Sequence, residues 1–186
     1  MGLNTKLQAE NKLILESGYK APAEPPTLWL QHKTANGTGG GAYTASPPAW
    51  LTRPLTHTIS NTISGATVNL TQNTFTLPVG SYYLDCTASV YSLVSGKLRL
   101  YNRTDAVDVF HGINWFATDI KPENKEAVLT GKFIVSTTPK EFEIQMLAYG
   151  TNANGLGYPV NLNTVHANWG SATAENIHLN LWVFKV

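Results

Sequence analysis

Apolar and polar residues alternate along most of the chain after Trp50, which is the pattern of β-strands. The clearest strand is expected over residues 80–91, where one face carries Tyr82, Leu84, Cys86, Ala88 and Val90. Its other face carries Tyr83 and Tyr91 among polar residues. A face that met only water would have little reason to present tyrosines, so we expect the core to cover one side and a neighbouring subunit the other.

Further short strands, each bounded by turn residues, are predicted over 51–59, 66–70, 74–77, 97–102, 106–111, 127–137, 141–149, 159–162 and 176–186. Pro54 cannot donate to a strand ladder, so the first of these is expected to be an edge strand or to contain a bulge. No helix long enough for a βαβ crossover is predicted. The pattern therefore predicts an all-β, antiparallel sandwich of about eight to ten strands.

The last predicted strand changes character along its length. Ile177, Leu179, Leu181 and Val183 form one apolar phase, and the other phase begins polar and becomes apolar at Trp182, Phe184 and Val186. One end of this strand is therefore expected to be buried on both faces. We predict that the C-terminus lies within or beside a subunit contact.

The first 49 residues have a different composition. A short helix is predicted over 4–17, and after it come prolines and a glycine-rich run over 36–41. We interpret residues 1–49 as an extended N-terminal anchoring arm and residues 50–186 as the sandwich domain. The arm is either a disordered leader or a segment that docks on another protein through Leu28, Trp29 and Leu30. We favour docking, because an exposed Trp between two leucines would promote aggregation if nothing covered it.

Composition and charge exclude several function classes. Charged residues make up 13% of the chain and the formal net charge is +1, so the sequence lacks the excess of basic residues that nucleic-acid binding requires. No segment approaches the ~18 apolar residues of a membrane span, and the N-terminus lacks the pattern of a signal peptide. We expect synthesis in a reducing cytoplasm, with the single cysteine, Cys86, acting as a small buried hydrophobe.

Two turn motifs carry a family resemblance. The segments LPVGSY at 77–82 and LYNRTD at 100–105, with the strands around them, resemble the tumour-necrosis-factor- and complement-like jelly rolls of bacteriophage structural proteins. The resemblance covers about residues 50–186. It implies a jelly roll that assembles as a homotrimer on the virion, as a decoration protein, a head or neck fibre, or an adaptor, with capsid, neck or tail proteins as its partners. The expected trimer interface is made of Tyr83, Tyr91, Tyr101, Trp182 and Phe184.

The residues give no signature of catalysis, metal or cofactor. The five histidines are scattered without a zinc-binding motif, and no G-x-S-x-G nucleophile elbow is present. Asp105 and Asp108 lie three positions apart, which offers too few oxygen ligands for a calcium loop. The sequence therefore favours a protein that is not an enzyme and has no cofactor.

A second function stays open, that of a receptor-binding module. Trp115 and Tyr158 lie in predicted loops with Asn and Gly neighbours, and such rings could stack on the sugars of a host surface glycan. The plainer interpretation is that both are ordinary loop aromatics.

Overall fold

In the computed structural model, the described residues are 24–116, 124–160 and 175–186, and within these ranges every regular element is a strand. The strands are β1 (Thr27–Thr34), β2 (Leu51–Thr52), β3 (His57–Asn61), β4 (Thr67–Asn69), β5 (Thr74–Leu77), β6 (Gly80–Tyr91), β7 (Ser95–Asn102), β8 (Val107–His111), β9 (Trp115–Phe116), β10 (Asn124–Val135), β11 (Lys140–Tyr149) and β12 (Asn176–Lys185). The helix expected over 4–17 lies outside the described residues.

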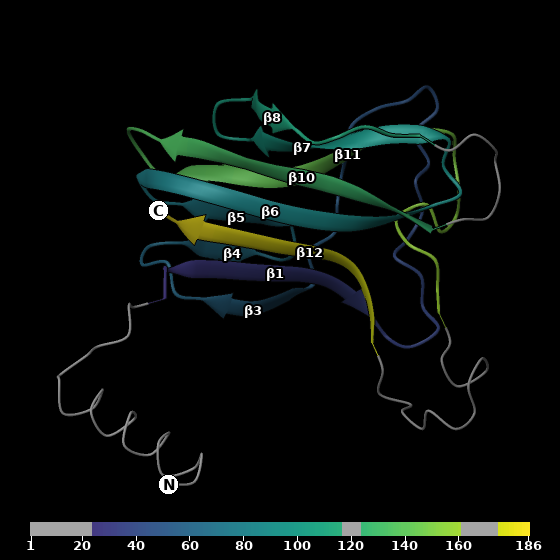
Figure 1. Ribbon diagram of the computed structural model, residues 1–186, viewed down its shortest axis with the longest axis horizontal. Helices are drawn as coiled ribbons and strands as arrows, with labels where there is room; N and C mark the ends of the chain where they lie inside the picture. Colours follow the sequence, from purple (N-terminus) through teal and green to yellow (C-terminus); the bar gives the residue numbers. More distant parts are fainter. Residues whose placement is uncertain (1–23, 117–123, 161–174) are drawn as a thin grey trace, which may run out of the picture.

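The strands form two antiparallel sheets that pack face to face. The β6 sheet has the order β10-β6-β12-β1-β3 and lies in front in Figure 1. The β11 sheet has the order β4-β5-β11-β7-β8, with β2 paired to β11 and β9 paired to β7. Because the chain repeatedly crosses from one sheet to the other, the predicted all-β jelly-roll sandwich is confirmed.

The core lies between the sheets and follows the predicted alternation. On β6 the phase of Tyr82, Leu84 and Cys86 is fully buried, and the opposite phase is only partly buried. At one end of the core, Phe133 meets the rings of Tyr82 and Phe142 at centroid distances of 5.6 and 5.4 Å. The inner face of this strand is therefore core, as expected.

The structure corrects the boundary placed after residue 49. Strand β1 lies between β12 and β3 in the β6 sheet, and both Leu28 and Leu30 are fully buried. The prolines and glycines around this strand favoured an arm, whereas its own residues alternate and find a partner in β12, at the far end of the chain. The sandwich therefore begins by Thr27, and Leu28 and Leu30 are core residues rather than docking residues.

Smaller differences concern strand bounds. The single strand expected over 51–59 is two strands, β2 and β3, with Pro54 in the break between them. Strand β9 was not predicted, and residues 159–160 of the expected strand 159–162 are irregular, with the rest outside the described ranges. The turn after β7 is as expected: Asn102 Nδ2 donates to Asp105 Oδ2 at 2.8 Å, and the Asp105 amide donates to Asn102 Oδ1 at 3.0 Å.

Candidate functional site

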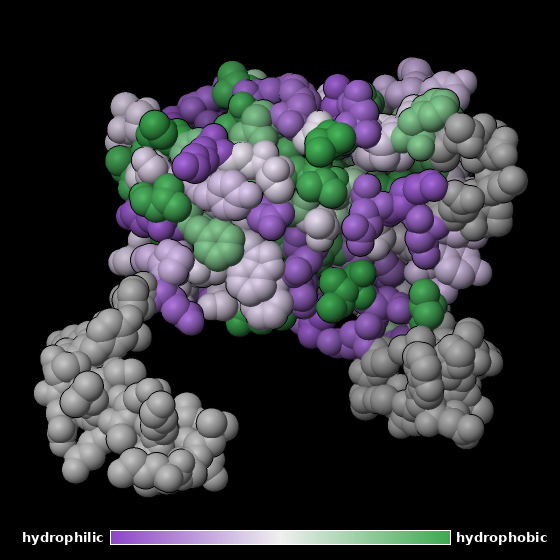
Figure 2. Space-filling model, in the orientation of Figure 1, coloured by the Kyte–Doolittle hydropathy of each residue, from purple (hydrophilic) through white to green (hydrophobic). Residues whose placement is uncertain are grey.

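Four rings gather on the outer surface of the β6 sheet, and we call Trp29, Tyr83, Trp182 and Phe184 the aromatic face. Strand register brings them together, because Trp29 pairs with Trp182 and Phe184 pairs with Tyr83. Trp182 stacks on Trp29 with centroids 4.1 Å apart, and on Phe184 at 6.0 Å with planes 2° apart. Figure 2 shows pale and green surface over this part of the β6 sheet.

The indole N–H of Trp29 is satisfied within the sheet. Trp29 Nε1 donates to Asn180 Oδ1 at 2.6 Å, and Gln31 Nε2 donates to the same oxygen at 3.2 Å. The indole N–H therefore needs no outside acceptor. All four residues are only partly buried, so apolar ring surface remains accessible to a partner, which favours contact with another apolar surface.

The apolar surface continues to the end of the chain. Ile134 of β10 is 73% exposed and the C-terminal Val186 is 67% exposed. Both line a depression with Tyr82 and Phe133, in which Ser81 and Lys132 are the polar residues, and the Val186 amide donates to the Ser81 carbonyl at 3.0 Å. The end of β12 is thus not buried on both faces in the single chain, because Trp182 and Phe184 are only partly buried and Val186 is exposed. The expected subunit contact beside the C-terminus stays a prediction.

The five residues expected at a trimer interface do not share one surface. Tyr83, Trp182 and Phe184 belong to the aromatic face, whereas Tyr91 lies at the far end of β6 and contacts Tyr158 at a centroid distance of 4.4 Å. Tyr101 lies on β7, in the other sheet. Trp29, which sequence reasoning had assigned to the arm, takes part instead, and its alternation with Leu28 and Leu30 was the signal for this position.

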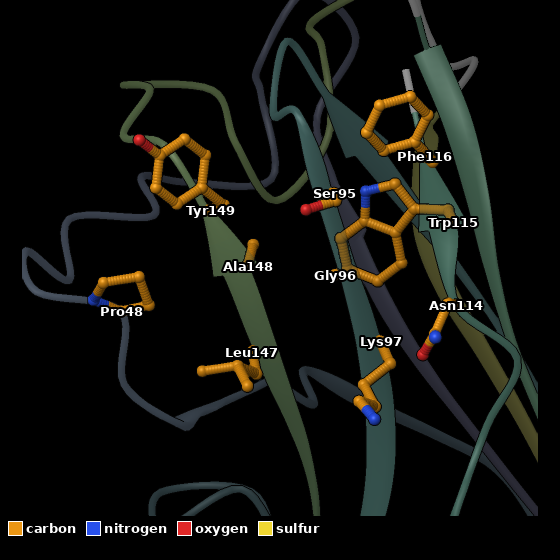
Figure 3. Close-up of a pocket in the computed structure, with 10 residues that line it drawn as sticks. All are labelled: Pro48, Ser95, Gly96, Lys97, Asn114, Trp115, Phe116, Leu147, Ala148 and Tyr149. Atoms are coloured by element: carbon orange, nitrogen blue, oxygen red, sulfur yellow. The ribbon is translucent and has the colours of Figure 1, made fainter. Parts of the chain in front are cut away.

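A second surface is a groove in the β11 sheet, drawn in Figure 3 and called here the Ser95 groove. In the strand register Ser95 of β7 is paired with Phe116 of β9 on one side and with Tyr149 of β11 on the other. Phe116 is 70% exposed and Tyr149 is 63% exposed, so two large rings flank a small serine. The groove has a volume of about 370 Å³, within the ~300–1,000 Å³ of small-molecule sites.

Trp115 lies beneath this groove. It is 7% exposed, and a Cβ built on Gly96 would come 2.4 Å from its ring and 2.2 Å from the Leu147 carbonyl oxygen. Glycine at 96 therefore lets the indole lie directly against β7. Trp115 Nε1 is buried without a hydrogen-bond partner in the described part of the chain.

The groove also contains polar side chains with unused hydrogen-bonding capacity. Lys97 and Asn114 lie together at one end of it in Figure 3, beyond Ser95. Among the described residues of the lining, Lys97 alone is charged. Tyr158, the second ring of the expected receptor loops, is not among the lining residues, so the structure does not bring Trp115 and Tyr158 to one pocket.

The outer surface of the β11 sheet carries a network whose members are already paired. The Arg99 guanidinium lies 4.1 Å from the ring centroid of Trp50 and 4.6 Å from that of Tyr101. It also contacts Asp108 at 2.5 Å and donates through Nε to Gln145 at 2.7 Å. We interpret this network as structural, and it accounts for the partial burial of Tyr101.

The two aspartates weighed as a calcium loop are each held by a cation. Asp108 pairs with Arg99, and Asp105 pairs with Lys140 at 2.7 Å. The hydrogen bond from Lys140 lowers the pKa of Asp105. No group of acidic, histidine or cysteine side chains within the described ranges could hold a metal ion, and no helix there has the length and hydrophobicity of a membrane span.

Inside the sandwich lies a buried cation, Arg53, which is fully buried. Its Nη2 donates to the Leu156 and His178 carbonyls at 2.9 and 3.0 Å, and burial lowers its pKa to about 10. The His32 ring lies 5.3 Å from that of His178, and burial, followed by the charge of Arg53, lowers the pKa of His32 to about 3. Both histidines are therefore neutral at pH 7.

Cys86 is a fully buried free thiol in the same core. Burial raises its pKa to about 12, with Arg53 opposing the change. A thiol that remains protonated and inaccessible is a poor nucleophile, so Cys86 serves packing, as expected.

No protein-family model matches the chain, and no curated protein sequence matches it. Solved structures with a similar fold include Eiger TNF from S. frugiperda, with a TM-score of 0.49, 6% identity and coverage of 88% of this chain and 94% of that one. Murine APRIL has a TM-score of 0.46 and 9% identity, with coverage of 87% of this chain and 99% of that one. The globular domain of zebrafish complement 1qA has a TM-score of 0.42 and 12% identity, with coverage of 85% of this chain and 93% of that one.

Proposed function

We propose that this protein is a non-enzymatic structural component of a bacteriophage particle, which assembles as a homotrimer through its aromatic face and joins the capsid, neck or tail through its N-terminal residues. The observation that carries the assembly is the aromatic face itself. Exposed clusters of large apolar side chains on soluble proteins mark interaction surfaces. The resemblance of the 77–82 and 100–105 turns to those of phage jelly rolls supports the virion as the setting.

The aromatic face suits a self-contact. Aromatic residues are enriched in the buried centre of protein interfaces, and charged residues are depleted there. A stable interface buries about 800 Å² on each partner, which is more than four partly buried rings can provide. The contact would therefore extend past Lys132, which is paired with Tyr83, to the exposed side chains of Ile134 and Val186.

The start of the described chain supports a role for the residues before it. The Lys185 amide donates to the Pro26 carbonyl at 2.9 Å, and Thr27 pairs with Phe184. The chain therefore enters β1 beside the aromatic face. In a trimer built on this face, the three N-terminal segments would leave the assembly near the subunit contacts, where one particle site could engage all of them.

Light scattering on the full chain tests the assembly. We expect a mass three times that of the 20.3 kDa chain, and a lower mass for Ile134→Lys, because the charge would fall within the contact. Val107→Lys is the matched control, since Val107 is also exposed but lies on β8 of the other sheet. A monomeric wild-type protein would contradict the trimer.

Incorporation into particles tests the virion role. Deletion of residues 1–23 leaves β1 intact, so the protein should fold and assemble but no longer be recovered with purified particles. Recovery equal to that of the full chain would contradict anchoring by these residues. Absence of the full chain from purified particles, with normal expression, would contradict the virion role itself.

The Ser95 groove favours a second function, attachment to a glycan on the host surface. Its two exposed rings on either side of Ser95 are the observation that supports this function. Binding of the full chain to host cells, lost after enzymatic removal of their surface glycans, would support it. Unchanged binding after that treatment would contradict it.

A further inference from the structure

The Ser95 groove has the geometry of a clamp for a flat ligand. Neighbouring strands lie about 4.8 Å apart, so residues on the strands to either side of β7 are separated by roughly 10 Å. Phe116 and Tyr149 occupy these two positions, and Ser95 lies between them. Figure 3 shows the ring of Tyr149 on one side of Ser95 and that of Phe116 on the other. A single ring-shaped molecule fits between two such walls.

Three polar side chains, those of Ser95, Lys97 and Asn114, lie in an otherwise apolar lining, which argues against a purely apolar ligand. The Ser95 hydroxyl and the Asn114 amide form no hydrogen bond within the described part of the chain, so they can serve a ligand. Pyranose rings combine apolar C–H faces with hydroxyl groups around the edge. Aromatic walls with hydroxyl and amide groups between them match both features.

Lys97 sets the charge that the groove would accept. It lies two register positions from Ser95, paired with Leu147, and it forms no ion pair in the described ranges. The other lining residues are uncharged. An acidic group on the ligand would therefore find a cation at this end and no carboxylate among the described lining residues to oppose it.

We propose that the Ser95 groove binds an acidic saccharide, with one sugar ring between Phe116 and Tyr149 and a carboxylate at Lys97. Ser95 and Asn114 bind ring hydroxyls, and Trp115 supports the floor from below. This inference rests on the second proposed function, host attachment, and names its ligand class and residues. It is independent of the trimer, because the groove and the aromatic face lie on different sheets.

Binding of the full chain to an array of neutral and carboxylated oligosaccharides, followed by calorimetry on the best ligand, tests the proposal. We expect retention of carboxylated sugars, and at least a tenfold weaker affinity for Tyr149→Ala and for Phe116→Ala. Because both side chains are largely exposed, these variants should fold normally. Val107→Ala is the matched control, an exposed apolar residue outside the groove, and its affinity should equal that of the wild type.

Lys97→Met isolates the acidic part of the recognition. It should lose about tenfold in affinity for the carboxylated sugar and little for the neutral analogue. No retention of any carboxylated sugar, equal binding by Tyr149→Ala, or equal selectivity in Lys97→Met would each overturn the proposal. Light scattering on the same samples separates these results from the assembly: a trimer that binds no sugar contradicts the groove alone.

Discussion

The indole rings of Trp29 and Trp182 stack with centroids 4.1 Å apart and planes 16° apart. This contact joins the first strand of the described chain to the last, on the outer surface of the β6 sheet. Stacking adds to the ladder hydrogen bonds that already hold β1 against β12. It also fixes the orientation of two of the four rings that we propose as the trimer contact.

Trp29→Ala should destabilise the protein by about 1–3 kcal/mol, because it removes the stacked pair and part of the apolar cover of β12. It should also weaken self-association. Trp29→Phe retains a ring and should lose less than half as much stability. Urea unfolding measures the first effect and light scattering the second. A Phe variant as unstable as the Ala variant would show that stacking is unimportant.

Gly96→Ala should destabilise the protein by about 1–3 kcal/mol through overpacking. The added Cβ would lie 2.2 Å from the Leu147 carbonyl oxygen and 2.4 Å from the Trp115 ring, so the backbone of β11 or the indole must move. Ser95→Ala, one position away, should change stability by no more than about 0.5 kcal/mol. Thermal unfolding and the near-ultraviolet circular dichroism of the tryptophans report both results.

Acid should destabilise the fold through the buried histidine pair. The pKa of His32 is about 3 in the folded protein and 6.5 for a solvent-exposed histidine, as in the unfolded chain. Between pH 3 and pH 6.5 the unfolded chain therefore binds more protons than the folded one. Stability should therefore fall as pH decreases from about 6.5, by up to about 1.4 kcal/mol per pH unit from this group. Burial lowers the pKa of His178 too, which acts in the same direction.

Urea unfolding of the wild type and of His32→Gln between pH 4 and pH 7 measures this dependence. The variant should have a shallower pH profile, whatever its stability at pH 7. Parallel profiles for the two proteins would contradict the assignment to His32.

Truncation should separate the N-terminal segment from the fold. Deletion of residues 1–23 should preserve cooperative unfolding, whereas deletion of residues 1–34 should produce insoluble protein, because it removes β1 and the buried Leu28 and Leu30. Sedimentation of the soluble fraction and a urea titration of each product distinguish the two. A soluble, cooperatively folded product lacking residues 1–34 would contradict the place of β1 in the sandwich.

Local alternation was enough to predict the longer strands. In β6 the phase of Cys86 is buried and the phase of Tyr83 faces outward, as the sequence indicates. Pro54 was expected to place one strand over 51–59 at an edge or to give it a bulge, whereas it lies in a break between two strands, because it cannot donate to a ladder. The turn at Asn102–Asp105 was also predictable, since its hydrogen bonds join residues three positions apart.

The assignment of residues to surfaces was not predictable in the same way. Tyr83 and Tyr101 look equivalent in sequence, yet they lie on opposite sheets, because sheet membership depends on pairing between distant strands. The Ser95 groove likewise needs β7, β9 and β11 in one register before Phe116 and Tyr149 flank the serine. Strand β1 was missed for the same reason, because its place in the sheet depends on pairing with β12, which lies far along the chain.

The pairing of β1 with β12 has a consequence for synthesis. Trp29 donates to Asn180 across 151 positions of sequence, so β1 leaves the ribosome long before its neighbour exists. The β6 sheet can be completed only after β12 has been synthesised, and folds dominated by such distant pairings form slowly. Translation products that stop before β12 would expose the leucines of β1 without a partner, and such exposed strands are prone to aggregate.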